Sequence, residues 1–308
     1  MKKISHRQIT HPPSDAAIAR RRYSTGMKLH TDAIPTVTQH NCTARLSLGF
    51  ANDAGTTRLI ERSHFGPLRI QKALYPEHPS VCHAIVVHPP GGVVGGDQLT
   101  LKVHVGTTAA ALIATPGAAK WYRANGYVSS QDIHLNAALA ASLEWLPQET
   151  IFFNGAQVKL ATTVELAADA TYLGCEILCF GRTASGEQFD HGSIRQHTTI
   201  RRDGKLIWFE QGRIDGGDAV MHSPLGLAGA TVSATLLACG KNLSAAALTS
   251  LREALGAEVG VTQMKSVLVV RYLGTTSEVA RRIMLTAWQH LRPAMLQREA
   301  ITPRIWET

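Results

Sequence analysis

The sequence contains no long apolar run and few aromatic residues. No stretch of about eighteen consecutive apolar residues occurs among its 308 residues, so we expect no membrane-spanning helix. Its five cysteines are an odd number, which argues against a disulfide framework and indicates reduced thiols in the cytoplasm. Cys175 and Cys179 would lie on one face of a strand, where we expect small buried apolar side chains rather than a metal-binding pair.

Sequence patterns of catalysis and of metal coordination are also missing. The fourteen histidines are dispersed, and the chain has no His-Glu-x-x-His, no repeated Cys-x-x-Cys and no Gly-x-Ser-x-Gly pattern. An enzyme needs a nucleophile, a base or a metal held by convergent ligands. The absence of these patterns is consistent with a chain that is not an enzyme and that holds no cofactor tightly, but it does not by itself exclude catalysis.

Positive charge predominates in the chain. A formal net charge of +8 and an isoelectric point of about 9.4 predict attraction to an acidic partner. The basic residues are scattered and no nucleic-acid-binding motif accompanies them, so we expect neither nucleic acid nor a membrane as partner. Residues 1–40 are basic and almost without apolar periodicity, which predicts a disordered N-terminal extension before a folded domain of residues 41–308.

Residues 41–308 alternate between short apolar segments and clusters of glycine, proline and asparagine. Side chains that alternate with a period of two predict many short strands, from residues 45–50 to residues 266–272. Two helices are expected in the C-terminal third, one between a cap at Ser244 and a stop at Gly256, the other from Ser277 to a stop at Pro293. The pattern predicts one large, mainly β domain with two helices.

The most unusual segment is the decapeptide His88-Pro-Pro-Gly-Gly-Val-Val-Gly-Gly-Asp97. Two prolines and four glycines are incompatible with the interior of a regular helix or strand, and apolar strands are predicted on both sides. A phosphate-binding loop would need a Lys-Ser/Thr pair or a helix after the glycines, whereas Asp97 leads into a strand. We therefore predict a shaped β connection, with a backbone surface that a partner or an ion could approach closely.

Several idiosyncratic segments between about Gly66 and the C terminus occur in a recognisable order. They are Tyr75-Pro-Glu77, Cys82-His83, HPPGGVVGGDQL (88–99), TPGAAKWYR (115–123), LEWLPQE (143–149), GRTASGE (181–187) and PRIW (303–306). Together they resemble the urease accessory protein family called UreD or UreH. The resemblance implies an unusual β-rich fold of stacked sheets with two helices, a topology that the strand pattern alone does not predict.

The resemblance also implies a role in urease maturation. Proteins of this kind bind the urease apoprotein on one side. On the other side they bind a helical accessory protein of the UreF type, which recruits a nickel-carrying GTPase of the UreG type. A water-filled tunnel is proposed to pass Ni²⁺ through the β-rich member.

Three acidic residues match acidic positions of the family and are expected to line that tunnel: Asp97, Glu176 and Glu210. Carboxylates hold Ni²⁺ more weakly than cysteine or several imidazoles would, so a transiently bound ion can be released. From the residues alone, strand alternation could equally turn each carboxylate toward solvent or toward an arginine such as Arg182 or Arg213.

Two further groups of residues are candidates for contacts. Cys82, His83 and His88 match family positions and are candidate metal ligands, although a structural role is favoured because a tight Cys/His site would trap nickel. Charged and aromatic side chains typical of protein interfaces, with an ordinary strand start as the alternative, occur at Lys120, Trp121, Tyr122, Arg123, Arg304 and Trp306.

Several functions therefore compete. The preferred hypothesis is a non-catalytic scaffold and Ni²⁺ conduit in urease maturation, and its nearest rival is a purely conformational chaperone of the apoprotein. A metal-dependent enzyme that uses the region from Cys82 to Asp97 would hold a stoichiometric metal ion. A basic nucleic-acid-binding protein would show a steep dependence of binding on salt.

Overall fold

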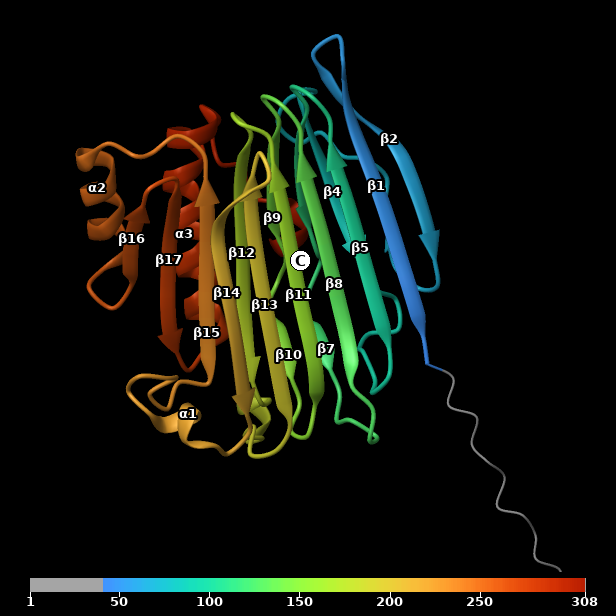
Figure 1. The fold of residues 1–308 in the computed structure, drawn as a ribbon, viewed down its shortest axis with the longest axis vertical. Helices are drawn as coiled ribbons and strands as arrows, with labels where there is room; N and C mark the ends of the chain where they lie inside the picture. Colours follow the sequence, from blue (N-terminus) through green and yellow to red (C-terminus); the bar gives the residue numbers. More distant parts are fainter. Residues whose placement is uncertain (1–40, 308) are drawn as a thin grey trace, which may run out of the picture. The chain divides into compact units, whose positions relative to one another are not determined.

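The computed structural model describes residues 41–307, which form two stacked β-sheets with helices on one side (Figure 1). This confirms the expected mainly β class, the stacking of many short strands and the two longer helices. The predicted disorder of residues 1–40 lies outside the described residues.

The first layer is a seven-stranded sheet. In order across the sheet, its strands are β14 (Lys205–Asp215), β13 (Ser193–Arg202), β11 (Gln157–Leu166), β8 (Ser129–Ala137), β5 (Gln98–Val105), β1 (Thr43–Asp53) and β2 (Thr56–Phe65). The pairs from β13 to β1 are parallel, and the edge strands β14 and β2 pair antiparallel with their neighbours.

The second layer is a ten-stranded sheet. Its main path runs through β16 (Gly260–Met264), β17 (Val267–Gly274), β15 (Val232–Cys239), β12 (Thr171–Phe180), β9 (Ser142–Leu146), β6 (Ala110–Ala114), β4 (Val81–Val87) and β3 (Arg69–Ile70). Two short strands lie off this path, β10 (Thr150–Phe152) beside β12 and β7 (Ala119–Trp121) beside β10. Strands β7, β10 and β16 were not predicted, because three to five residues carry too little periodicity.

Successive strands in the middle of the chain alternate between the two sheets. Strands β4 and β6 belong to the ten-stranded sheet, whereas β5 and β8 belong to the seven-stranded sheet. Two parallel neighbours need a crossover connection between them, and here a strand of the other sheet takes the place of the usual helix. The glycine-rich segment from His88 to Asp97 is one such crossing, from β4 to β5, which confirms the predicted β connection.

Alternation of side chains builds the core between the sheets. Leu46, Leu48 and Phe50 of β1 belong to the same buried cluster as Leu178 and Phe180 of β12. Facing sheets lie about 10 Å apart. Because successive side chains of a strand point to opposite faces of the sheet, every second residue points into the layer between the sheets. Any polar residue at such a position is therefore held between the sheets.

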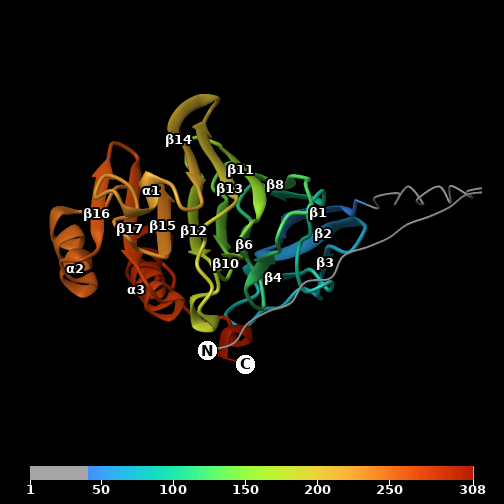
Figure 2. The same cartoon turned by 90° about the horizontal axis from the view of Figure 1, so that it is seen from below.

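A third layer of helices covers the other face of the ten-stranded sheet (Figure 2). The helices are α1 (Ala219–His222), α2 (Ala245–Leu255) and α3 (Ser277–Leu296), with single 3₁₀ turns at Thr183–Ser185 and Arg304–Glu307. Of these, α2 and α3 pack on the sheet. Cys175, Ile177 and Cys179 are buried in this second core, as predicted for the two cysteines. No helix within residues 41–307 combines the length and the apolar character needed to cross a membrane.

The two long helices differ in how well their sequence predicts their ends. Helix α2 is confirmed: the Ser244 hydroxyl accepts the Ala247 N–H at 3.2 Å, and the helix ends at Gly256. The predicted stop of α3 at Pro293 is wrong, because α3 continues to Leu296. Proline removes one backbone donor, but Met295 and Leu296 pack on the second core, and this burial keeps the last turn helical.

A buried arginine anchors α3 to the ten-stranded sheet. The Arg292 side chain is fully buried, and its Nε lies 3.1 Å from both carboxylate oxygens of Glu144 on β9. Its Nη2 donates to Glu77 at 2.6 Å and its Nη1 to the carbonyl of Glu299, while the Trp288 indole also donates to Glu144 at 2.6 Å. Every nitrogen of the guanidinium is therefore partnered, which is what a buried charge requires.

Removal of this anchor should destabilise the whole protein. In an Arg292→Met variant Glu144 and Glu77 lose their counter-ion, and we expect the free energy of unfolding to fall by about 3 to 5 kcal/mol. Denaturant unfolding of the purified chain measures this value. Arg282→Met, at an exposed position of the same helix, is the matched control and should change it by less than about 0.5 kcal/mol. Equal effects of the two variants would contradict the anchor.

Candidate functional site

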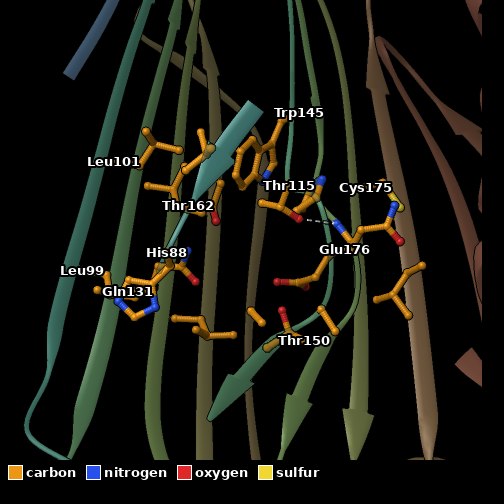
Figure 3. Close-up of a pocket in the computed structure, with 18 of the residues that line it drawn as sticks. His88, Leu99, Leu101, Thr115, Gln131, Trp145, Thr150, Thr162, Cys175 and Glu176 are labelled. Carbon is orange, nitrogen blue, oxygen red and sulfur yellow. Dashed lines mark hydrogen bonds between the residues drawn. The ribbon is translucent and has the colours of Figure 1, made fainter. Parts of the chain in front are cut away.

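A cavity of about 270 Å³ lies between the two sheets (Figure 3). Leu99, Leu101 and Ile133 of the seven-stranded sheet and Trp145 of the ten-stranded sheet supply apolar parts of its wall. The polar residues of the lining include His88, Thr115, Gln131, Thr150, Thr162, Glu176, Gln196, Thr198 and Glu210. An apolar cavity with a few inward-directed polar groups is the usual form of a binding site or passage.

Glu176 lies at the centre of the lining, which also includes the ionisable side chains of Lys120 and Glu210. It lies on β12 between the inward-facing Gly174 and Leu178, so alternation turns its side chain into the space between the sheets. The Gln196 amide of β13 donates to its carboxylate. Burial, and secondarily the nearby Glu210, raise the pKa of Glu176 to about 7, which means that the carboxyl is readily protonated near neutral pH.

Glu210 reaches the same cavity from the edge strand β14. Its Oε1 accepts a hydrogen bond at 2.5 Å from Nη2 of Arg271 on β17, so this ion pair joins the edge strand of the seven-stranded sheet to the ten-stranded sheet. Both side chains of the pair are partly open to solvent, at 29% and 49% exposure for Glu210 and Arg271. The sequence left open that an arginine such as Arg182 or Arg213 pairs with the carboxylate. Glu210 does pair with an arginine, but the partner is Arg271.

His88 lies in the lining on the other side of the cavity from Glu176 (Figure 3). Its Nε2 is buried and has no hydrogen-bond partner among residues 41–307. Burial lowers the pKa of His88, against the opposing effect of Asp97, so the neutral imidazole is favoured. A neutral imidazole with an unpartnered ring nitrogen can accept a proton or contact a passing cation.

Asp97 does not lie in the cavity lining, which corrects its grouping with Glu176 and Glu210. Its Oδ1 accepts the backbone N–H of Cys42 at 2.9 Å and its Oδ2 that of Val94 at 3.0 Å. The buried carboxylate therefore clamps the glycine-rich crossing to the start of β1. Short-range sequence could not reveal this role, because Cys42 is 55 residues away.

The remaining candidate metal ligands point in different directions. Cys82 faces the core between the sheets, and burial raises the pKa of its thiol. His83 faces the helices, where its Nε2 lies 2.6 Å from Glu77. Although burial opposes it, hydrogen bonds from His83 and Arg292 hold the pKa of Glu77 below its usual range. Cys82, His83 and His88 are thus not brought together, and no group of three or more His, Cys, Asp or Glu side chains in residues 41–307 is arranged to hold a metal ion.

Comparison with known proteins agrees with the family resemblance of the motifs. The family of UreD urease accessory proteins matches residues 42–307. A urease accessory protein UreD from Janthinobacterium sp. (strain Marseille) is 61% identical over 284 residues, which are 91% of this chain and 96% of that protein. A urease accessory protein UreD from Nitrosospira multiformis is 54% identical over 271 residues, or 86% and 97% of the two chains. The chain belongs to the UreD family of urease accessory proteins.

In this member of the UreD family, the candidate interface residues differ in exposure. Lys120, Arg123 and Arg304 are exposed. Tyr122 is half-buried, with its ring edge-on to Phe153 at 4.9 Å and over Gly92, where a Cβ would strike it. These residues remain available to a partner to different degrees.

Two tryptophans of the candidate interface take up internal contacts. The prediction for Trp121 is corrected, because the pairing of β7 with β10 turns its side chain into the core, where it is 1% exposed. Trp306 is half-buried and donates its indole N–H to the Thr115 carbonyl at 3.2 Å. Only the sheet pairing reveals that Trp121 is internal.

Sequence reasoning missed two polar residues of the site. Gln196 lies in the alternating strand β13, and the only signal was a polar residue at an inward position two residues after buried Ile194. Arg271 ends the apolar run of β17, where a charge in an otherwise buried strand could have indicated a carboxylate partner. Both face residues more than 15 positions away, so their partners required the fold.

The raised pKa of Glu176 predicts a dependence of stability on pH. Between its usual pKa of 4.5 and about 7, the folded state holds a proton that the unfolded chain has lost, so this group lowers stability as pH rises through that range. Glu176→Gln is always neutral. At about pH 8 we expect the free energy of unfolding of this variant to exceed that of the wild type by about 1 to 3 kcal/mol, and the two to converge only below about pH 4.5.

Denaturant unfolding at several pH values measures this difference. Glu165→Gln removes a carboxylate of β11 outside this cavity and is the control for the loss of one acidic group. A difference between Glu176→Gln and wild type that does not change with pH would contradict the raised pKa.

Proposed function

We propose that this protein is a non-catalytic scaffold and Ni²⁺ conduit in urease maturation. The observation that carries the proposal is a cavity between the sheets that has Glu176, Glu210 and the free Nε2 of His88 on its wall. These groups extend from His88 near the glycine-rich crossing to Glu210 at the β14 edge. Groups spread along the layer in this way support the transfer of Ni²⁺ from one group to the next rather than its storage at one point.

The chemistry of the wall suits passage of a divalent cation. Carboxylate oxygens and water bind Ni²⁺ weakly compared with thiolates or several imidazoles, and a conduit must release its cargo. Protonation of Glu176 near pH 7 would weaken its hold on a cation further.

The partners in this proposal are the urease apoprotein, a helical accessory protein of the UreF type and, through that protein, a nickel-carrying GTPase of the UreG type. Membership of a family named for urease accessory proteins supports this assignment. The five cysteines, all unpaired in the structure, support a cytoplasmic location. Neither nucleic acid nor a membrane is a partner in this scheme, and the scheme assigns no catalytic role to any residue of the chain.

A purely conformational chaperone of the apoprotein is the second candidate. One observation favours it: both cavity carboxylates already have protein partners, Glu176 with Gln196 and Glu210 with Arg271. In that case the cavity would be only a consequence of imperfect sheet packing.

The nickel content of matured urease separates the two candidates. Urease is matured in cells that carry either the wild-type chain or Glu176→Gln/Glu210→Gln, and nickel per urease active site is measured by atomic absorption. We expect the nickel content to fall severalfold while the recovery of the maturation complex by pull-down stays unchanged, because only the carboxylates of the route are lost.

Glu61→Gln/Glu165→Gln is the matched control, since it removes two carboxylates that do not line this cavity. This control should leave both readouts at the wild-type level. Normal nickel loading with the cavity variant would rule out a conduit that depends on these residues and leave the chaperone function.

A further inference from the structure

The outer face of the seven-stranded sheet is uncovered by the described part of the chain. Helices α2 and α3 pack on the ten-stranded sheet, on the side away from β14, β13 and β11 (Figure 2). The short helix α1 contacts the edge strand β14, and its Met221 is buried in the core between the sheets. The two sheets thus differ: the ten-stranded sheet is covered on both faces, whereas the seven-stranded sheet has one face without a cover within residues 41–307.

Three cations lie side by side on this outer face. Lys159 of β11 is the register partner of Arg195 of β13, and Arg195 is the register partner of Arg213 of β14. All three side chains are exposed, and their inward-facing neighbours Val158 and Ile194 are buried in the core between the sheets. Neighbouring strands are about 4.8 Å apart, and like charges at directly opposite positions destabilise a sheet. The three adjacent positive charges therefore lower the stability of the sheet.

The fold neutralises only part of this charge. Asp215, on the same face of β14, lies 2.7 Å from Arg213. The nearby Ser193 hydroxyl and the positive charges of Arg213 and Arg195 hold the pKa of Asp215 below its usual range. Lys159 and Arg195 make no salt bridge with any residue in 41–307. Two positive charges of the row therefore remain without an ion pair.

An exposed aromatic side chain adjoins the cationic row. Phe209 of β14 is 55% exposed, and its ring lies 5.2 Å from the ring of His197, the next outward residue after Arg195 on β13. Arginine and aromatic side chains together are the composition enriched at protein interfaces. Asp132 and Glu165 lie on the same face, so carboxylates border the cationic row and limit its positive charge to a small area.

We propose that the cationic row of Lys159, Arg195 and Arg213, with Phe209 beside it, is a docking surface for an acidic surface of a protein partner. Carboxylates of the partner would complete the charge pairs that the fold leaves open, and Phe209 would be buried at the contact. The inference rests on the proposed function only for the choice of probes, which are purified urease apoprotein and the purified helical accessory protein.

The test compares Lys159→Gln/Arg195→Gln/Arg213→Gln with a control of equal charge, Lys241→Gln/Lys265→Gln/Arg282→Gln, whose exposed residues lie away from this face. The dissociation constant of the full-length chain is measured for each probe at about 50 mM and about 300 mM NaCl. We expect the first variant to bind one of the two probes about tenfold or more weakly at the lower salt, with a smaller salt dependence. The control variant should bind both probes like the wild type.

A stability measurement separates lost binding from lost folding. Removal of opposed like charges should leave the melting temperature of the first variant unchanged or raise it by about 1 to 3 °C. If this variant is instead less stable, the single variant Arg195→Gln takes its place in the binding assay, and the same loss of affinity is expected with a smaller magnitude.

The outcomes of this binding assay can be told apart from those of the nickel-loading experiment that tests the conduit. Wild-type affinity of the charge variants for both probes would overturn the docking surface. Loss of binding to a single-stranded DNA oligonucleotide, with both protein affinities unchanged, would overturn it in favour of a nucleic-acid partner. A wild-type chain that binds neither probe would contradict the proposed function itself, and normal binding by Glu176→Gln/Glu210→Gln with low nickel loading would separate transfer from docking.

Discussion

The stacking of two sheets is the constraint on which the rest of the structure depends. Facing sheets leave a layer about 10 Å thick, and every second side chain of the central strands must fit into it. Most of these residues are apolar, but two inward-facing positions of β12 are occupied by Gly174 and Glu176. The space at Gly174 is filled by the Tyr172 hydroxyl, and Glu176 extends into the cavity. The cavity thus exists where the apolar packing of the layer is incomplete.

Buried charged groups on the two faces of the ten-stranded sheet differ in how completely they are paired. On the helix side, Arg292 pairs with Glu144 and Glu77 so that every guanidinium nitrogen has a partner. On the cavity side, Glu176 has an amide for a partner and no cation, and its pKa is raised. A fully paired charge stabilises the attachment of α3, whereas an unpaired carboxylate beside a cavity remains free to bind a proton or a cation.

Several motifs that identify the family have structural roles. Glu77, His83 and Glu144 come from three separate motifs and meet around Arg292, which lies in none of them. Asp97, the last residue of the glycine-rich decapeptide, clamps that crossing to β1. These motifs therefore indicated the right family, whereas the two acidic residues that line the cavity, Glu176 and Glu210, lie outside the quoted motifs.

Local signals along the chain determined the many strands, the capped helix α2, the excess of positive charge and the family resemblance, because periodicity and caps involve residues a few positions apart. The tertiary structure alone decided that successive strands alternate between sheets, that Trp121 is internal, that α3 continues past Pro293 and that three cations share one row. Each of these depends on pairing between distant segments. The free energy of such pairing comes from burial and from charge partners that do not exist until the sheets have formed.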